Sequence, residues 1–563
     1  MSKSLPNAAT RSARTDSGSA LRPDISRTGL LFTSVGSIVG SGWLFGALFA
    51  AQIAGPAALI AWVLGGAIML LLALIHAELG STYPVAGGSA RFPQYAFGGA
   101  AAFSGGWLAY LGALTTAPIE VEAILQYSST YVHGLTRESS NVTVLTRNGL
   151  LLAVLLMLIL SVVNVLGIKM MSESNKIAVW WKLAIPIVAA GIFLLNAPHL
   201  VNLTGGAGGF APYGVKGVLT AITSGGIVFA FTGFEQAVQV GSESRRPGRD
   251  IPFAVIGSII IGMVVYVLLQ LAFLVALDPA ALHHGWANVE FIGDGQTLGP
   301  FVGLALAGGL GWLSWILYAD AVISPSATGL LYIGTGSRIT YALAEDHYVP
   351  EGFARLSRGG VPVRAIVFSF ICGTLLLLPF PGWQSLVGFI SSATVLAYST
   401  AAVSLGALRK QDPDRVRPYR LPAARVLGPL GFVLSSELVL WSGWGVVWKL
   451  IVAVMVGFVL FGGSAASSSD RGDHPAEWRH AMWLWPYLVG LGVISCLGSF
   501  GTSEKAFGLV SGPTSQLPYG WDMAATAALG LVTYYFALNV RLPAARTLHY
   551  VTKVQRATRT PSA

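Results

Sequence analysis

The sequence predicts an all-α integral membrane protein with about fourteen transmembrane helices. Only 10% of its 563 residues are charged, whereas ordinary soluble domains contain about 25%, and its mean hydropathy is +0.66. Apolar runs of about 20 residues, the length that crosses a bilayer as a helix, recur along the chain. The run at 300–335 is too long for one upright span, so we expect it to be strongly tilted or broken. The fourteen runs lie near residues 29–52, 56–80, 101–131, 149–167, 175–196, 218–241, 254–277, 300–335, 363–380, 384–408, 426–443, 446–463, 482–500 and 522–540.

The basic residues indicate how the chain is oriented. With the N-terminus placed in the cytoplasm, the outer loops hold only Arg137, Arg147, Lys216 and Lys505, and almost all other Lys and Arg residues fall in the opposite loops and the two tails. This is the positive-inside pattern, and it favours an even number of spans because both tails are basic. The net charge of +9 is therefore attributed to one face of a cell (cytoplasmic) membrane and its lipids, and not to nucleic acid binding.

Composition also divides the chain into four parts. Residues 1–27 are predicted to form a disordered, basic cytoplasmic tail. Residues 28–425 form the predicted core with spans 1–10, and residues 426–541 hold four appended spans, 11–14. Residues 542–563 form a second basic cytoplasmic tail.

Several kinds of chemistry lack their usual signatures. The chain has no phosphate-binding loop motif and no metalloprotease or serine hydrolase motif, so neither a self-contained ATP-driven pump nor an enzyme is predicted. The cysteines lie in apolar runs. The histidines, including His76, are expected in loops or at helix ends, and apart from the adjacent pair His283 and His284 in an outer loop they are not spaced as metal ligands. We therefore predict no metal and no cofactor.

Two spans are unusually rich in glycine, and they lie five spans apart. Span 1 contains "GSIVGSG" and span 6 contains "TSGGIVFAFTGFEQ". Glycine-interrupted segments at corresponding places in two halves point to an inverted-repeat transporter and its binding site. We therefore predict a five-plus-five inverted repeat, with the two repeats at 29–196 and 218–408. The glycines expected at the helix breaks are Gly36, Gly40, Gly225, Gly226 and Gly233.

A break in span 1 between Ile38 and Gly42 would expose two kinds of backbone group. The N–H groups of Ser41 and Gly42 would carry a partial positive charge that suits a carboxylate. The carbonyls of Ser37 and Ile38 would suit an ammonium group. Bare backbone is tolerated at membrane depth only where it lines a cavity, so this pattern predicts a site for an α-amino acid. The alternative is that the glycines form a small-xxx-small seam for helix packing.

Several segments, in order, resemble the amino acid–polyamine–organocation (APC) permeases. "GSIVGSGWLF" is similar to the family's first-span signature, except at Trp43, where the family usually has Ile or Val. The resemblance covers roughly residues 28–425 and includes "AELGSTYPVAGGSARFPQYAFG", "FAFTGFEQAVQVGSESRRPGRDIPFA", "SRITYALAEDHYVPEGFARLSRGGVPVRA" and "RPYRLP". Fourteen spans resemble the bacterial aspartate:proton symporter subgroup. The resemblance implies the five-plus-five inverted-repeat (LeuT-like) fold and alternating access.

The resemblance also implies roles for individual residues. Backbone N–H groups after the first break would hold the substrate carboxylate, and carbonyls beside both breaks would hold its amino group. Phe229 falls at the position of an aromatic gate, and Glu235 at an acidic gating position. The substrate-binding residues that the resemblance implies are Ile38, Ser41, Gly42, Phe229 and Thr232.

Lys182, in "NKIAVWWKLAIPI", lies well inside span 5. A charge at the bilayer centre costs at least about 2.5–3.5 kcal/mol, so such a residue is a functional candidate. We predict that Lys182 gains and loses the coupled proton. The resemblance agrees, because proton-coupled relatives place a span-5 lysine amine where sodium-coupled relatives bind sodium. The alternative is that the side chain snorkels to the interface.

Three acidic residues in the predicted spans have several possible roles. Glu120 and Glu122 lie on opposite sides of a helix, so at most one of them faces the site. Asp320 could pair with Lys182 or act as a gate, or it could cap a helix break at Pro325.

Together, these features predict a secondary active transporter that moves an amino acid, aspartate or another, as a proton symporter. An amino acid or amine exchanger, in which Lys182 is structural, is the first alternative. A membrane sensor that binds without transporting is the second.

Overall fold

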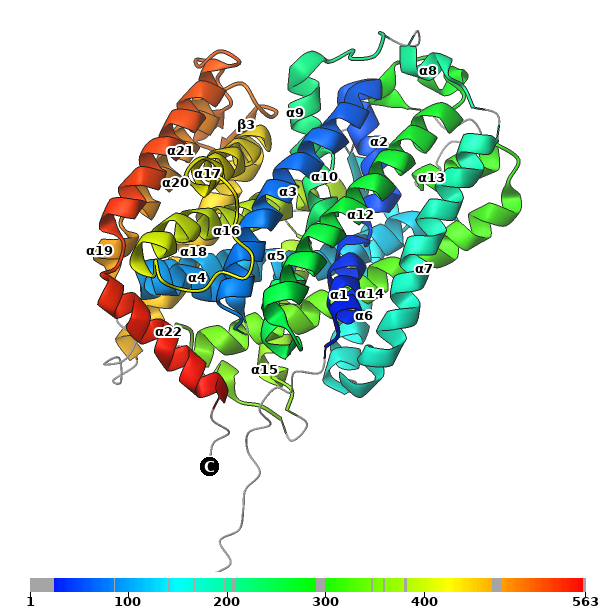
Figure 1. The fold of residues 1–563 in the computed structure, drawn as a ribbon. Coiled ribbons are helices and arrows are strands. Elements are labelled where there is room, and N and C mark those ends of the chain that lie inside the picture. The colour runs from blue at the N-terminus through cyan, green and yellow to red at the C-terminus, as the bar shows by residue number, and fades with distance from the viewer. Residues whose placement is uncertain are drawn as a thin grey trace, which may run out of the picture.

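The computed structural model describes residues 25–559, apart from 86, 140–141, 167, 197, 205–207, 290–298, 346–347, 358–359, 379–381 and 468–476. Most of the predicted N-terminal tail therefore lies outside the described residues. Long helices run between two opposite faces of the molecule (Figure 1). We call the face where α1 (Arg27–Ile38) begins and α22 (Ala544–Arg559) lies the termini face, and the opposite one the far face.

The first five predicted spans form one broken helix and four continuous ones. Span 1 is divided into α1 and α2, and the 3-10 turn η1 leads from α2 into α3. A short helix, α4, joins α3 to α5, and an antiparallel hairpin, in which Thr136 lies opposite Leu145, precedes α6. The bounds are α2 (Gly42–Ala54), η1 (Gly55–Ala57), α3 (Ala58–Thr82), α4 (Gly88–Phe97), α5 (Gly99–Ser128), β1 (Thr136–Ser139), β2 (Val142–Leu145), α6 (Arg147–Leu166) and α7 (Ile168–Leu195).

The next five spans also begin with a broken helix. Span 6 is divided into α9, α10 and α11, and the overlong span at 300–335 is broken between α13 and α14, one of the two outcomes expected for it. The helices are α8 (Val201–Thr204), α9 (Gly214–Ser224), α10 (Ile227–Phe231), α11 (Gln236–Gln239), α12 (Pro247–Ala276), α13 (Pro300–Ala307), α14 (Gly311–Glu345), α15 (Val363–Leu376) and α16 (Trp383–Gln411). The 3-10 turns are η2 (Gly241–Glu243), η3 (Pro279–Leu282), η4 (Trp286–Asn288) and η5 (Glu351–Ala354).

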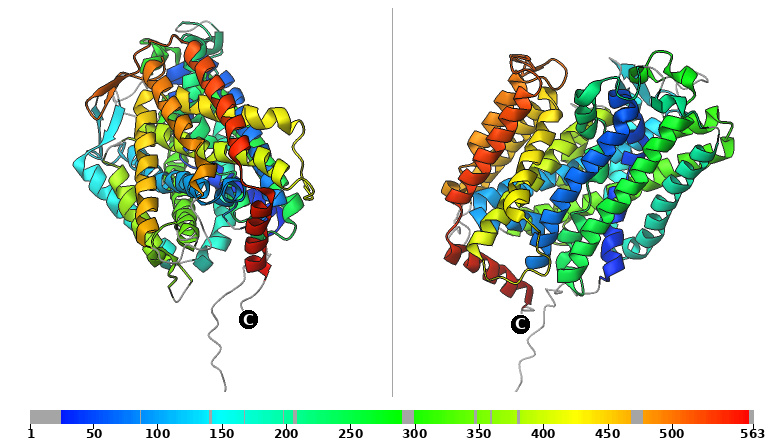
Figure 2. Two further views of the ribbon diagram at one scale, coloured as in Figure 1. Left: turned by 90° about the vertical axis from the view of Figure 1, so that its left-hand side faces the viewer. Right: turned by 45° about the horizontal axis from the view of Figure 1, so that its top comes forward.

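The appended helices stand as a block beside the core (Figures 1 and 2). Helix α16 packs against α5 of the core on one side and α17 of the block on the other, which explains why almost all of its length is buried. The elements are α17 (Ala424–Trp441), α18 (Trp444–Ser467), α19 (Trp478–Ala481), α20 (Leu484–Leu497), β3 (Glu504–Ala506), β4 (Val510–Gly512) and α21 (Trp521–Val540), followed by α22. In the β3–β4 hairpin Glu504 lies opposite Gly512.

The helix lengths explain how the fourteen predicted spans relate to the structure. Within the described residues, 11 helical stretches are long and apolar enough to cross a membrane, and one of them, Gly42–Thr82, joins the second half of span 1 to span 2. Spans 1 and 6 are not found as separate stretches because both are broken. Span 9 is not found because α15 has only 14 residues. The predicted all-α membrane fold, with helices 1 and 6 broken, is confirmed.

On the termini face, an ionic cluster ties α3 to α16 and to the loop that follows it. Glu78, near the end of α3, accepts hydrogen bonds from Arg409 of α16 (2.5 Å) and from the backbone N–H of Leu421 (2.6 Å). Arg417, in the "RPYRLP" loop, lies 3.4 Å from the same carboxylate. This loop is therefore fixed to the core by a buried carboxylate.

Candidate functional site

Helix 1 is broken where the sequence predicts, because α1 ends at Ile38 and α2 begins at Gly42. Side chains from other helices occupy two of the backbone groups that the break frees. The Tyr266 hydroxyl of α12 donates to the Ile38 carbonyl (2.9 Å), and the Ser41 N–H donates to Glu120 Oε2 of α5 (2.8 Å). The helix-1 break is therefore stabilised by side chains of neighbouring helices.

Helix 6 is broken twice, and its own glycines allow both breaks. Gly226, between α9 and α10, has φ +86°, and Gly233, between α10 and α11, has φ +118°. Both values lie in the region that residues with a Cβ rarely adopt. Gly225 ends α9 with ordinary helical angles. The predicted interruption of span 6 is confirmed, with Gly226 and Gly233 as the residues that require glycine.

The two broken helices touch each other at their breaks. A Cβ placed on Gly42 would lie 3.0 Å from the backbone of Ala230 in α10, and one placed on Gly233 would lie 2.7 Å from Ser37 in α1. The Ser34 hydroxyl donates to the Phe234 carbonyl (3.0 Å), which adds a direct bond between the helices. The breaks thus form one buried centre.

Most of the predicted substrate-binding backbone groups already have intramolecular partners. Tyr266 occupies the Ile38 carbonyl, and Glu120 occupies the Ser41 N–H. The Phe229 carbonyl accepts from the backbone N–H (3.0 Å) and the hydroxyl (2.7 Å) of Thr232. A substrate that used these groups would therefore have to exchange hydrogen bonds with them.

Of the two neighbouring acids on α5, Glu120 faces the site. Its Oε2 holds the Ser41 N–H, and a Cβ on Gly40 would collide with its Oε1. Within the described residues, Oε1 is buried without a hydrogen-bond partner. Both carboxylate oxygens of Glu122 are also buried without a partner there. The geometry therefore selects Glu120, which sequence reasoning left undecided.

Lys182 reaches from α7 to the last turn of α1. Its side chain is buried, with 2% of the residue exposed, and its amine donates to the Gly36 carbonyl (2.8 Å) and to the Thr328 hydroxyl of α14 (2.5 Å). The snorkelling alternative is wrong, because the amine ends inside the bundle. Lys182 therefore joins helix 1 to α14 beside the break.

The expectation that Asp320 caps a helix break at Pro325 is wrong. Helix α14 continues through Pro325, so there is no break to cap. Asp320 Oδ1 instead accepts a hydrogen bond from Ser324 one turn later (2.7 Å). Among the described residues Asp320 makes no direct salt bridge with Lys182, whose amine is bound to helix 1 and Thr328, but the two charges lie close enough to interact.

Gly36 is not a break glycine. It lies inside α1, and a Cβ added there would come 2.6 Å from Val179 Cγ2 of α7. It therefore acts in close helix packing, the alternative that we considered for the whole motif. Gly40, by contrast, lies within the break.

Aromatic rings close the site toward the far face. Phe229, the predicted gate, lies nearly perpendicular to Trp383 at 5.8 Å between ring centroids, and Phe45 and Phe49 lie 5.0 and 5.4 Å from the same indole. Trp383 Nε1 also donates to the Ser41 hydroxyl (3.0 Å). Sequence reasoning missed Trp383, because one tryptophan at the start of a span carries no distinctive pattern.

Polar side chains lie on the other side of the breaks. Glu235 Oε2 accepts from the Tyr398 hydroxyl of α16 (2.6 Å) and from the Gly233 N–H (2.9 Å). Glu235 and Tyr398 line a cavity of about 30 Å³ between α5, α11, α14 and α16. Such a volume has room for about one or two water molecules, so the site is closed around its centre in this conformation.

We expected His76 in a loop or at a helix end, and this expectation is wrong. The residue lies within α3 and is fully buried. Its ring lies edge-on to Phe234 (5.4 Å) and to Tyr398 (5.1 Å), and its Nδ1 is paired with the Leu72 carbonyl (2.8 Å). It therefore supports the residues around Glu235. Only its apolar surroundings in span 2 could have indicated this burial.

A membrane bundle whose two broken helices meet in a buried, polar centre defines a membrane transporter. The amino acid permease family model matches residues 25–493 of the chain. The chain is 37% identical to the glutamate/serine transporter AimA of Bacillus subtilis, over 91% of its own length and 92% of that relative. It is 32% identical to the aspartate-proton symporter of the same organism, over 92% and 96% of the two chains.

The chain therefore belongs to the amino acid permease family, and the resemblance found in its motifs is confirmed. It is an amino acid transporter of the membrane and not an enzyme. More distant relatives include human cationic amino acid transporter 4, which is 29% identical over 74% of this chain and 64% of that relative.

Proposed function

We propose that the chain is a proton symporter that carries an amino acid across the cytoplasmic membrane by alternating access. Both termini would lie in the cytoplasm, so that the termini face is the cytoplasmic one. The bias of Lys and Arg toward the loops on that side supports this orientation. The aspartate-proton symporter among the relatives supports the coupling.

The observation that carries the proposal is the position of the Lys182 amine. It donates at the same time to the Gly36 carbonyl of α1 and to Thr328 of α14, inside the bundle. A protonated amine makes strong charge-assisted hydrogen bonds to both groups, and the loss of its proton weakens them. Protonation would therefore fasten helix 1 to α14, and deprotonation would release it.

Glu120 supplies a link between substrate and proton. Its carboxylate occupies the Ser41 N–H, which is one of the groups proposed to hold the substrate carboxylate. Two carboxylates cannot share one donor at low cost, so the substrate would have to displace Glu120. Once displaced, the Glu120 carboxylate loses the hydrogen bond that stabilises its negative charge, so it binds a proton more readily. Substrate and proton would in this way stabilise the same state, as symport requires.

The lining of the cavity favours a small, uncharged polar amino acid such as serine over aspartate. Apart from Glu235, the polar residues that line it are tyrosines, threonines and glutamines, and no cationic side chain lines it in the described part of the chain. Hydroxyl and amide groups can bind a substrate hydroxyl, whereas Glu235 would repel a second carboxylate. The threonines and glutamines are Thr116, Thr232, Gln236, Gln239, Thr335 and Thr394.

The test is uptake into proteoliposomes of serine, glutamate, aspartate, leucine and lysine, with and without an acidic exterior. We expect serine uptake that the pH gradient accelerates. Counterflow without pH dependence would instead identify an exchanger, and substrate binding without flux would identify a sensor. Preference for aspartate would overturn the proposed substrate and leave the symport intact.

The first variant for this assay is Lys182→Met, which keeps most of the side-chain volume and removes the amine. We expect it to abolish the acceleration by the pH gradient. Lys449→Met is the matched control, because Lys449 pairs with Glu504 (2.9 Å) at the edge of the appended block and is far more exposed. Uptake by Lys182→Met with an unchanged pH dependence would exclude Lys182 as the proton carrier.

A further inference from the structure

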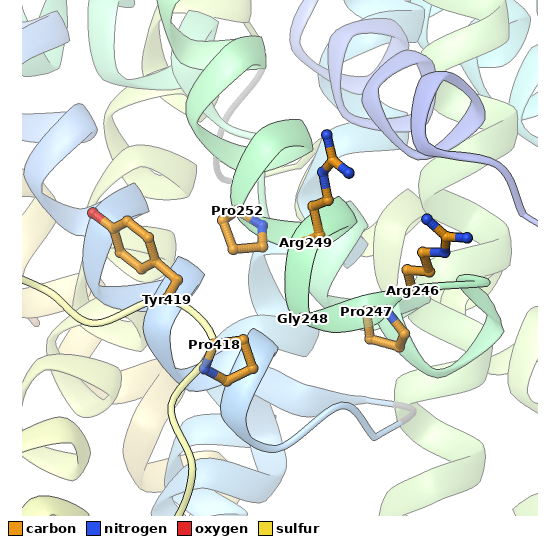
Figure 3. Close-up of a pocket in the computed structure, with 7 residues that line it drawn as sticks. All are labelled: Arg246, Pro247, Gly248, Arg249, Pro252, Pro418 and Tyr419. Atoms are coloured by element: carbon orange, nitrogen blue, oxygen red, sulfur yellow. The ribbon is translucent and has the colours of Figure 1, made fainter.

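A wide groove on the termini face is separate from the transport site. It has a volume of about 540 Å³ and is formed where the start of α12 meets the loop between α16 and α17 (Figure 3). The two segments are in close contact, because a Cβ on Gly248 would lie 2.9 Å from Pro418. The residues that matter for its chemistry are Arg246, Arg249, Pro252, Pro418 and Tyr419.

The groove is cationic. Arg246 and Arg249 are both exposed, and in Figure 3 their side chains extend from the start of α12 away from Pro418 and Tyr419. Within the described residues neither guanidinium forms an ion pair. The nearest acids in sequence are Glu243 and Asp250, and neither forms an ion pair within the described residues. Asp250 is buried and accepts hydrogen bonds from the Ser244 hydroxyl (2.8 Å) and the Arg246 N–H (3.1 Å). The charge of Asp250 therefore stabilises the start of the helix, and neither acid is paired with an arginine of the groove.

The rest of the groove is apolar or neutral. Proline rings form much of its surface, and Tyr419 adds a phenol. Partial burial, and then the negative charge of Glu78, raise the pKa of Tyr419, so the phenol remains a neutral hydrogen-bond donor. An apolar floor with a cationic edge suits an amphiphilic anion better than a small inorganic one.

The same face of α12 continues from the groove as an apolar stripe. Phe253, Ile260 and Val264 follow Arg246 and Arg249 at helical spacing and are 37%, 44% and 62% exposed. Arg27 of α1 lies over the Phe253 ring, with its guanidinium carbon 3.6 Å from the centroid. One helix face thus has arginines at the membrane boundary and exposed apolar side chains within the membrane.

We propose that this groove binds the headgroup of an anionic phospholipid of the cytoplasmic leaflet, with its acyl chains along the Phe253–Val264 stripe. The proposal uses the orientation proposed above and does not depend on the transported substrate. Basic recesses between membrane helices on the cytoplasmic side suit anionic headgroups, and a guanidinium can bind a phosphate through two parallel hydrogen bonds. A free phosphate would use the arginines but would leave the apolar stripe without a role.

A bound lipid would connect two parts of the core. The groove loop is fixed to α3 through the Leu421 N–H and Arg417, which both contact Glu78, whereas α12 directly follows the broken helix 6. A headgroup held by the α12 arginines beside this loop would bind only while the two parts keep their folded arrangement. We therefore expect the lipid to stabilise the solubilised transporter against heat.

The test is native mass spectrometry of the full-length protein, released from micelles that contain equal parts of phosphatidylglycerol and phosphatidylcholine. We expect phosphatidylglycerol to be retained preferentially. An arginine near an anionic membrane contributes about fivefold to binding, so Arg246→Gln with Arg249→Gln should weaken retention roughly 25-fold. Arg246→Lys with Arg249→Lys should keep much of it.

The matched control is Arg355→Gln with Arg479→Gln, two exposed arginines outside the groove. It should retain phosphatidylglycerol as the wild type does, and the lipid should raise its unfolding temperature equally. Unchanged retention by the Arg246/Arg249 glutamine variant would overturn the site. Displacement of the lipid by inorganic phosphate or glycerol phosphate at similar concentration would overturn the lipid as its source.

Discussion

The two helix breaks at the centre of this transporter are maintained by different means. In helix 6, the backbone itself carries the break, through the positive φ of Gly226 and Gly233. In helix 1, no residue between Ile38 and Gly42 has a positive φ, and side chains from four other helices hold the freed groups.

This difference suggests a division of labour between the two helices. A break that depends on left-handed glycines is permanent, because the chain cannot close it without moving those residues into other regions. A break that depends on a carboxylate and an amine changes whenever either group gains a proton or a new partner. We therefore expect helix 6 to provide fixed geometry and helix 1 to respond to protons and substrate.

The largest effect is expected at Gly233. An alanine there would adopt an unfavourable φ, at a cost of about 1–3 kcal/mol, and its Cβ would lie 2.7 Å from Ser37. Gly233→Ala should reduce uptake below detection. Gly134→Ala is the control, because Gly134 has φ +85° but open space around it. Normal uptake by Gly233→Ala, with both variants inserted at wild-type levels, would contradict a fixed break in helix 6.

The next largest effect is expected in helix 1. Gly40→Val would collide with Glu120 and crowd the Thr328 hydroxyl (3.1 Å), and Gly42→Val would press on the backbone of Ala230 (3.0 Å). Overpacking of this kind costs about 1–3 kcal/mol of stability, and we expect this cost to fall on the substrate-bound conformation, where it lowers substrate affinity about five- to 150-fold. Equilibrium binding to the purified variants checks this. If both variants bind normally, "GSIVGSG" is only a packing seam.

A smaller but more specific effect is expected for Glu120→Gln. The amide can still accept a hydrogen bond from the Ser41 N–H, but it cannot take up a proton. A hydrogen bond to a charged group is worth about 1.5–3 kcal/mol, so we expect about a tenfold slower uptake, together with a flattened pH profile. Glu122→Gln, two residues away on the other side of α5, should leave the pH profile unchanged. An unaltered profile in Glu120→Gln would remove Glu120 from the coupling.

The sequence predicts the positions of the two helix breaks. It says much less about the side chains that form hydrogen bonds with the backbone groups freed there. Glycines within an apolar run mark a local backbone property, and both interruptions lie where "GSIVGSG" and "TSGGIVFAFTGFEQ" predict them. Burial of a charge is also costly, so Lys182 was visible as a candidate. The partners were not visible, because Glu120 is 79 residues from Ser41 and Tyr266 is 228 residues from Ile38.

Long-range contacts of this kind depend on how the helices pack, and helical periodicity indicates a face but not the neighbour that covers it. This explains why Glu120 and Glu122 could not be distinguished, and why Trp383 and the burial of His76 were missed. It also explains the error at Gly36. A glycine needed for close approach and a glycine needed for a break look identical in a single sequence.

The smallest expected effect tests that distinction at Gly36. Alanine gains about 1 kcal/mol of helix propensity over glycine, but its Cβ would come 2.6 Å from Val179 on α7, so the two effects largely cancel. We expect Gly36→Ala to lower the unfolding temperature slightly, and Val179→Ala in the same chain to restore it, with a favourable coupling of about 1 kcal/mol between the two sites. Gly191→Ala, in α7 with open space around it, should show the propensity gain alone.

Because the Gly36 carbonyl remains in place for Lys182, the pH dependence of uptake should persist in the double variant. Loss of the pH dependence would show that Gly36 is needed for proton coupling. Helix 1 would then depend on its own glycines, as helix 6 does.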